Sequence, residues 1–111
     1  MRHEARLTIN GRKWRIKLVP AREMPRDALG DCDHPPGPHP TIRVRRNLSQ
    51  RQMLEILLHE LLHASRPELD ESAIEQSAKE CAAGLYAMRY RRRTNAETSQ
   101  GQTIRQGRAE S

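Results

Sequence analysis

The chain has 111 residues, with 20 Lys and Arg against 14 Asp and Glu, and only 35% of it is hydrophobic. This length allows one domain and excludes complete TIM barrels and doubly wound sheets. No apolar run approaches the roughly 20 residues of a membrane span, the first residues lack the apolar stretch of a signal peptide, and two cysteines are too few for a disulfide scaffold. We therefore expect a reduced, cytoplasmic protein that does not bind membranes.

The charge is divided unevenly along the chain. Residues 1–48 carry a net charge of +6, residues 49–87 a net charge of −4, and residues 88–111 a net charge of +4. A basic balance is typical of proteins that bind nucleic acid or other anions. The acidic middle segment indicates that the whole chain is not one basic binding surface.

The first half of the chain predicts three strands. Apolar and polar residues alternate in residues 5–19 on both sides of Asn10-Gly11, a pair that favours a tight hairpin turn because both residues tolerate a positive φ. Trp14 on the apolar face is expected to anchor the core. Residues 20–40 contain six prolines and no periodicity, which predicts a loop. Alternation returns in residues 41–46, which predict the third strand.

Two helices are expected to follow. Ser49 begins a capping-box pattern, and the apolar residues after it extend around most of a helix that ends before Pro67. Such a helix is expected to lie centrally. Asp70 is the candidate N-cap of a second helix that runs to about Arg91, with Cys81 packed on its apolar stripe.

These elements predict one α+β domain over residues 1–93, in which a small antiparallel or mixed three-stranded sheet packs on two antiparallel helices. Residues 94–111 have almost nothing to bury and are expected to be disordered.

The central helix contains His59-Glu60-Leu61-Leu62-His63, an H-E-x-x-H motif. One helical turn separates the two histidines, so both imidazoles project from one face and can hold one Zn²⁺. Glu60 would lie beside the metal, where it can take a proton from bound water. A core helix that contains these residues by chance is disfavoured, because burying them without a partner costs several kcal/mol.

A catalytic zinc needs a third protein ligand and an open position for water. The turn between the two helices is short, and short connections give antiparallel neighbours. Pairing about Pro67 brings Glu71 level with His63 and Glu75 level with His59. We expect Glu71 to be the third ligand, with Glu75 either accepting a hydrogen bond from a ligand histidine or serving as the ligand instead. A solvated acidic first turn, favoured by the helix dipole, would explain the same two glutamates without a metal.

The segment from Leu57 to Ala64 resembles the active-site helix of zincin metallopeptidases, and the segment from Asp70 to Tyr86 resembles the second helix of small zinc peptidases that are mostly encoded by phages and prophages. These proteins are related to the SprT-like and ImmA-like groups, and the resemblance covers residues 7–90. It implies a minimal zincin-like fold and zinc bound by two histidines and a downstream acidic residue. Those roles map onto His59, His63 and Glu71, with Glu60 as the base. If the protein is encoded by a phage, the resemblance also implies that the protein is located in the cytoplasm of the host cell.

The predicted reaction is metal-assisted hydrolysis of a protein or peptide substrate. Zinc lowers the pKa of bound water towards about 7 and polarises the scissile carbonyl. Glu60 accepts the proton of the water and passes it to the leaving amine. The strand over residues 41–46 is expected to be the sheet edge that pairs with the extended substrate.

One alternative is a non-catalytic zinc-binding interaction module. A structural zinc site is closed by four protein ligands, so Cys32, His34 or His39 would then supply the fourth. An open position would instead favour the enzyme.

Another alternative is association with nucleic acid through the basic hairpin and the basic tail. The candidate contacts at the end of the second helix are Arg89, Arg91, Arg92 and Arg93. A solvated helix end followed by a solubilising tail would explain the same residues without a partner.

Overall fold

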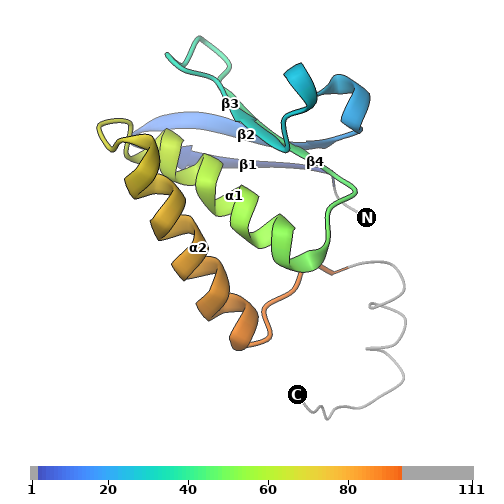
Figure 1. The fold of residues 1–111 in the computed structure, drawn as a ribbon. Coiled ribbons are helices and arrows are strands. Elements are labelled where there is room, and N and C mark those ends of the chain that lie inside the picture. The colour runs from blue at the N-terminus through green and yellow to red at the C-terminus, as the bar shows by residue number, and fades with distance from the viewer. Residues whose placement is uncertain (1–2, 94–111) are drawn as a thin grey trace.

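The computed structural model describes residues 3–93 and contains one mixed sheet and two α-helices (Figure 1). In chain order the elements are β1 (Glu4–Ile9), β2 (Arg12–Val19), the short 3₁₀ turns η1 (Ala21–Glu23) and η2 (Pro25–Asp27), β3 (Gly30–Cys32), β4 (Thr41–Arg45), α1 (Gln50–Ser65) and α2 (Glu71–Ala87). The α+β class predicted from the sequence is therefore confirmed.

The hairpin forms at the predicted place. Strands β1 and β2 pair antiparallel around Asn10 and Gly11, which have φ angles of 51° and 75°. The Asn10 side-chain amide also donates a hydrogen bond of 2.9 Å to the carbonyl oxygen of Ser65. The turn therefore satisfies one of the carbonyl groups that the end of α1 leaves without a helical partner.

The prediction of three strands is wrong by one, because residues 20–40 also contain β3. The sheet order is β1-β2-β4-β3, with β4 parallel to β2 and antiparallel to β3. A three-residue strand that begins with Gly30 shows no alternation of its own. It is held in place by β4 and by Arg43, whose guanidinium contacts the carboxylates of Asp31 at 2.8 Å and Asp33 at 3.0 Å.

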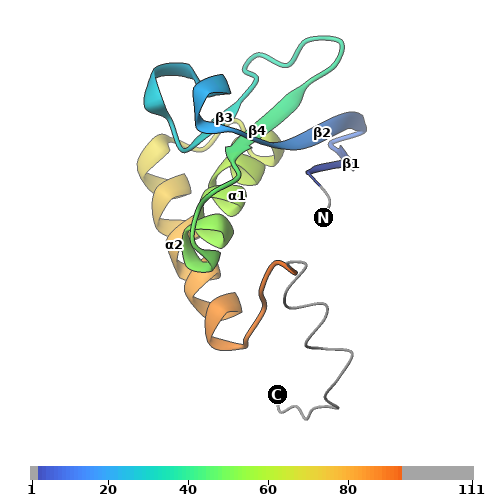
Figure 2. The same cartoon turned by 90° about the vertical axis from the view of Figure 1, so that its right-hand side faces the viewer.

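The same topology corrects the predicted substrate-facing edge. Strand β4 lies inside the sheet, with β2 on one side and β3 on the other, so its backbone is already paired on both sides. The edge strands are β1 and β3. The loop between β3 and β4 projects beyond the sheet in both views of the fold (Figure 2).

Helix α1 lies between the sheet and α2. One face of the sheet supplies the core with buried side chains, namely Ile9, Trp14, Leu18, Ile42 and Val44, which pack with Met53 and Ala64 of α1. Helix α2 packs on the other side of α1, and this explains why the apolar residues of α1 extend around most of its circumference. Trp14 is only 3% exposed, so its predicted role as a core anchor is confirmed.

Two predictions for α2 are wrong. Its buried stripe consists of Ile74, Ala78 and Ala82, spaced four residues apart, whereas Cys81 lies off this stripe and is exposed. The helix also ends at Ala87 rather than near Arg91, because the chain turns back at Arg89, which has a positive φ of 71°.

Residues 94–111, predicted to be disordered, lie outside the described part of the chain. Within residues 3–93, neither helix has the length and apolarity that crossing a membrane requires.

Candidate metal centre

Helix α1 presents His59 and His63 on one face. The Ser49 side chain caps the start of this helix by accepting a hydrogen bond of 3.2 Å from the Gln52 N–H. Because the two histidines are four residues apart, their imidazoles stand one above the other, with Nε2 atoms 3.2 Å apart and ring centroids 4.9 Å apart. Both side chains are partly buried, and their Nε2 atoms face the same point.

The first residue of α2 completes this arrangement. Asp70 caps the helix, because its carboxylate accepts a hydrogen bond of 2.8 Å from the Ala73 N–H. This fixes Glu71 in the first turn, where its Oε2 lies 3.0 Å from Nε2 of His59 and its Oε1 lies 3.0 Å from Nε2 of His63. The antiparallel packing of the two helices thus brings together the three residues predicted as ligands.

The spacing of these atoms fits a zinc ion. Ligand atoms placed tetrahedrally at about 2.05 Å from zinc are separated from one another by about 3.3 Å. The two Nε2 atoms are 3.2 Å apart, and each lies 3.0 Å from a different oxygen of the Glu71 carboxylate, so these distances are close to this value. Imidazole nitrogens and a carboxylate are also the donor types that zinc accepts. The three residues therefore form a donor set that could hold a zinc ion without a large rearrangement.

The second acidic candidate lies elsewhere. The Glu75 carboxylate is 3.5 Å from the ammonium group of Lys79, and its side chain is 55% exposed. Among residues 3–93, the cluster of possible metal donors contains only His59, His63 and Glu71. Glu71 is therefore the carboxylate that faces the histidines.

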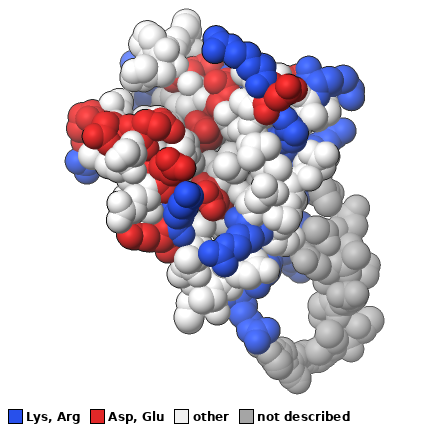
Figure 3. All heavy atoms as spheres, in the orientation of Figure 1, with Lys and Arg blue, Asp and Glu red and all other residues white. Residues whose placement is uncertain are grey.

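A hollow of about 400 Å³ opens beside the three donors. Helices α1 and α2 form one wall of it, and β3 with the start of the following loop forms the other. Its lining residues are Gly30, Asp31, Cys32, His34, His59, Glu60, His63 and Glu71. The acidic residues among them belong to an acidic part of the surface, because Asp and Glu side chains gather over the α1–α2 loop and the start of α2 (Figure 3).

Glu60 is the buried carboxylate of this hollow, with 8% of the residue exposed. Burial raises the pKa of Glu60 to about 7, and the neighbouring carboxylates of Asp31 and Glu71 act in the same direction. Its position depends on Gly30, because a Cβ atom at Gly30 would lie 2.9 Å from Oε2 of Glu60 and 2.5 Å from Cγ2 of Ile56. Only glycine lets β3 approach α1 this closely.

No protein-family model, curated protein or solved structure matches this chain. The assignment of the site therefore depends on the motif and on the geometry described above.

The candidates for a fourth ligand lie outside the donor cluster. Cys32 and His34 line the hollow, whereas His39 lines a different hollow beside Trp14. Burial raises the pKa of the Cys32 thiol to about 12, with Glu60 adding to the effect. In the described part of the chain the donor set thus has three members.

The arginines at the end of α2 are far from this site. Ala87 lies 16 residues beyond Glu71, which corresponds to about 24 Å along a helix. The Arg91 guanidinium stacks 3.4 Å from the ring centroid of Tyr86, and the backbone of Arg92 exchanges two hydrogen bonds of 2.8 Å with the side chain of Gln50. Arg89 and Arg93 are exposed. This segment therefore packs partly against the start of α1.

The sequence did not predict the strand that forms the wall opposite the ligands. Asp31 and Cys32 reach the hollow only because β3 joins the sheet edge, and Gly30 contributes by lacking a side chain. Of these three residues, only Cys32 was a candidate from the sequence, as a possible fourth zinc ligand.

Proposed function

We propose that this protein is a zincin-like, zinc-dependent metallopeptidase that hydrolyses peptide bonds. The main support is a set of three donor residues at one side of an open hollow that also contains the buried carboxylate of Glu60. The Nε2 atoms of His59 and His63 are 3.2 Å apart, and each lies 3.0 Å from one oxygen of Glu71. His59, His63 and Glu71 would hold the zinc ion. A bound zinc ion supplies a Lewis acid and lowers the pKa of a bound water to about 7.

Glu60 acts as the general base in this proposal. It follows His59 directly in α1, and its carboxylate lines the same hollow as the three donors. A carboxylate at this position can accept a proton from water and deliver it to the leaving amine. The neighbouring wall of β3 restricts the side chain of Glu60 and shields it from solvent.

The substrate is proposed to pair with β3. This strand is the sheet edge that lines the hollow, and an extended peptide can extend a sheet at a free edge through backbone hydrogen bonds. Pairing there would place a peptide bond of the substrate above the three donors. In this proposal β3 takes the place of β4 as the strand that pairs with the substrate, because β4 lies inside the sheet.

A non-catalytic zinc-binding module is the competing hypothesis for the function of this protein. Structural zinc sites are closed by four protein ligands, whereas the donor cluster within residues 3–93 has three. The presence of Glu60 in the hollow is also better explained by a reaction, because a buried carboxylate has no structural benefit beside two further acidic groups.

The proposal is tested by measuring zinc content and peptide cleavage on the same variants. Purified protein loaded with zinc is incubated with an unfolded protein and with a library of short peptides, and new amino termini are detected by mass spectrometry. Glu60→Gln is expected to retain one zinc per chain and to lose cleavage. Glu71→Gln is expected to lose zinc, and Glu75→Gln is the matched control that should retain both properties.

Two results would contradict the proposal. Cleavage by the Glu60→Gln variant would exclude the role of Glu60 as the base. Stoichiometric zinc in the unmodified protein without cleavage of any peptide would favour the non-catalytic module.

A further inference from the structure

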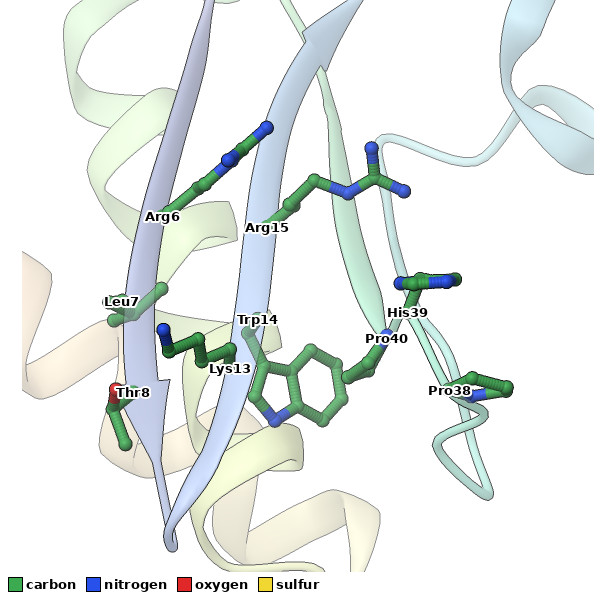
Figure 4. A pocket seen from close by; sticks show the side chains of 9 residues that line it. All are labelled: Arg6, Leu7, Thr8, Lys13, Trp14, Arg15, Pro38, His39 and Pro40. Carbon is green, nitrogen blue, oxygen red and sulfur yellow. The ribbon is translucent and has the colours of Figure 1, made fainter.

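The sheet has a second hollow on the face that points away from the helices (Figure 4). It has a volume of about 700 Å³, lies between the β1–β2 hairpin and the loop that precedes β4, and shares no lining residue with the metal site. Arg6 of β1 and Lys13 and Arg15 of β2 line this hollow. We refer to it as the cationic hollow.

The positive charge of the cationic hollow is not neutralised within residues 3–93. No carboxylate oxygen of the described residues lies within 4 Å of Lys13 or Arg15, and Arg6 has only a 3.9 Å contact with the partly exposed Glu4. By contrast, Arg43 on the same face is neutralised by two aspartates at 2.8 and 3.0 Å. Lys13 and Arg15 therefore keep a charge that no described carboxylate neutralises, whereas the charge of Arg43 is balanced.

The arrangement of these cations is unfavourable for the protein alone. Arg6 and Arg15 are directly opposite each other in the antiparallel register of β1 and β2. Like charges in opposed positions destabilise a strand pair, so the pairing has a cost that an anionic ligand would remove.

The opposite wall of the cationic hollow is fixed and partly apolar. Its residues are Pro38, His39 and Pro40, and the indole of Trp14 borders it (Figure 4). The Arg15 N–H donates to the carbonyl oxygen of Pro40 at 3.1 Å, which attaches this wall to β2. A preformed hollow loses little conformational entropy when it binds a ligand.

We propose that the cationic hollow binds single-stranded nucleic acid, with phosphates on Arg6, Lys13 and Arg15 and an unpaired base against His39. A polymer is favoured over a single phosphate because Lys13, Arg15 and Lys17 alternate along β2 and follow one another at about 6.7 Å on the same face. An aromatic ring beside a positively charged track is the usual arrangement for binding single strands.

The charge distribution also separates this surface from the metal site. A polyanion is repelled by the acidic start of α2, which lines the metal hollow, and is attracted by the hairpin. A membrane surface is a poorer match for the cationic hollow. The large apolar side chains that are exposed in the described region, Met88 and Tyr90, follow α2 and do not lie on the sheet face.

The test measures binding of a fluorescein-labelled oligothymidylate to the full chain by fluorescence anisotropy at several salt concentrations. Each phosphate contact contributes about 0.7 to the slope of log K against log salt for a single strand. The Lys13→Gln/Arg15→Gln variant is therefore expected to lower this slope by about 1.4 and the affinity at 0.1 M salt by about 25-fold. Arg22→Gln/Arg26→Gln removes the same charge from exposed positions outside the hollow and should bind nearly as well as the unmodified protein.

A third variant tests the base contact. His39→Ala is expected to weaken binding about fivefold without changing the salt slope, since stacking is insensitive to salt. Circular dichroism and zinc content should be the same for all variants and report that each is folded.

Four results would overturn the proposal. The first two are an equal loss of affinity in both double variants, and an affinity that Lys13→Gln/Arg15→Gln leaves unchanged. The third is tighter binding of a duplex than of the single strand. The fourth is displacement of the oligonucleotide by polyglutamate at equal charge concentration. The last result would identify the ligand as an acidic polypeptide.

Discussion

Replacement of Gly30 by alanine tests the contact between β3 and α1. The new Cβ atom would lie 2.5 Å from Cγ2 of Ile56, 2.9 Å from Oε2 of Glu60 and 3.0 Å from Cγ of Glu60. Carbon atoms in favourable contact are about 3.5–4.0 Å apart, so β3 and α1 would have to separate by about 1 Å. Ile56 cannot easily rotate away, because a β-branched side chain has one strongly preferred rotamer in a helix.

This overlap has a predictable magnitude. Overpacking of this kind costs typically 1–3 kcal/mol, and in a domain of this size each kcal/mol lowers the melting temperature by roughly 4–8 °C. We expect Gly30→Ala to lower it by about 8–16 °C, from a cost of about 2 kcal/mol. Because a substrate paired with β3 would shift by about 1 Å relative to Glu60 and the two histidines of α1, cleavage by the zinc-loaded protein should fall by about 100-fold.

Gly84 provides the matched control, since a Cβ atom there would meet no atom within 4 Å. It lies inside α2, where alanine is more favourable than glycine by about 0.5–1 kcal/mol, so Gly84→Ala should raise the melting temperature. Thermal unfolding followed by circular dichroism measures both variants. If Gly30→Ala is as stable as Gly84→Ala, the close approach of β3 to α1 is refuted.

The remaining predictions concern the metal and the cysteines. Removing zinc with a chelator should lower the melting temperature, because a ligand present at 100 times its dissociation constant stabilises the folded state by about 2.7 kcal/mol; an unchanged calorimetric transition would exclude a zinc site in the folded state. Glu71→Gln should abolish this metal-dependent shift and Glu75→Gln should preserve it, and an equal loss in both variants would contradict the assignment of Glu71. In chelator at pH 8, Ellman's reagent should modify exposed Cys81 rapidly and Cys32 at least 100-fold more slowly, since a thiol with a pKa of about 12 is almost entirely protonated there. Rapid modification of Cys32 in the Cys81→Ser variant would contradict the raised pKa, whereas raising the pH towards 12 should increase the rate.

Local signals in the sequence were enough for the hairpin and for both helix starts. Asn10-Gly11 satisfies the positive φ angles of its turn with neighbouring residues alone, and Ser49 and Asp70 cap helices through atoms three residues away. The spacing of His59 and His63 follows from helical geometry. These features depend on short-range interactions, which a linear pattern contains.

The placement of Glu71 required one further step. The short connection after α1 implied antiparallel helices, and that geometry brings the start of α2 beside the histidines. The sequence could not decide between Glu71 and Glu75, because both lie in the first two turns of α2. The tertiary structure separates them, since the Glu75 carboxylate contacts Lys79 and the Glu71 carboxylate faces both Nε2 atoms.

The elements that the sequence did not predict are determined by contacts between distant residues. Strand β3 has three residues and no alternation, and it exists through pairing with β4 and the contacts of Arg43 with Asp31 and Asp33. Its presence moves the sheet edge from β4 to β3 and builds the wall opposite the ligands. In the same way, packing of α2 on α1 leaves Cys81 exposed, although its position in the sequence suggested burial.

The sequence alone therefore determined the secondary structure around the H-E-x-x-H motif and the identity of its histidines, because both depend on neighbours along the chain. The tertiary structure decided which carboxylate joins them, which strand forms the open edge, and where the positive charge of the hairpin remains uncompensated. Each of these depends on residues that are far apart in the sequence and meet only when the sheet and the two helices pack together.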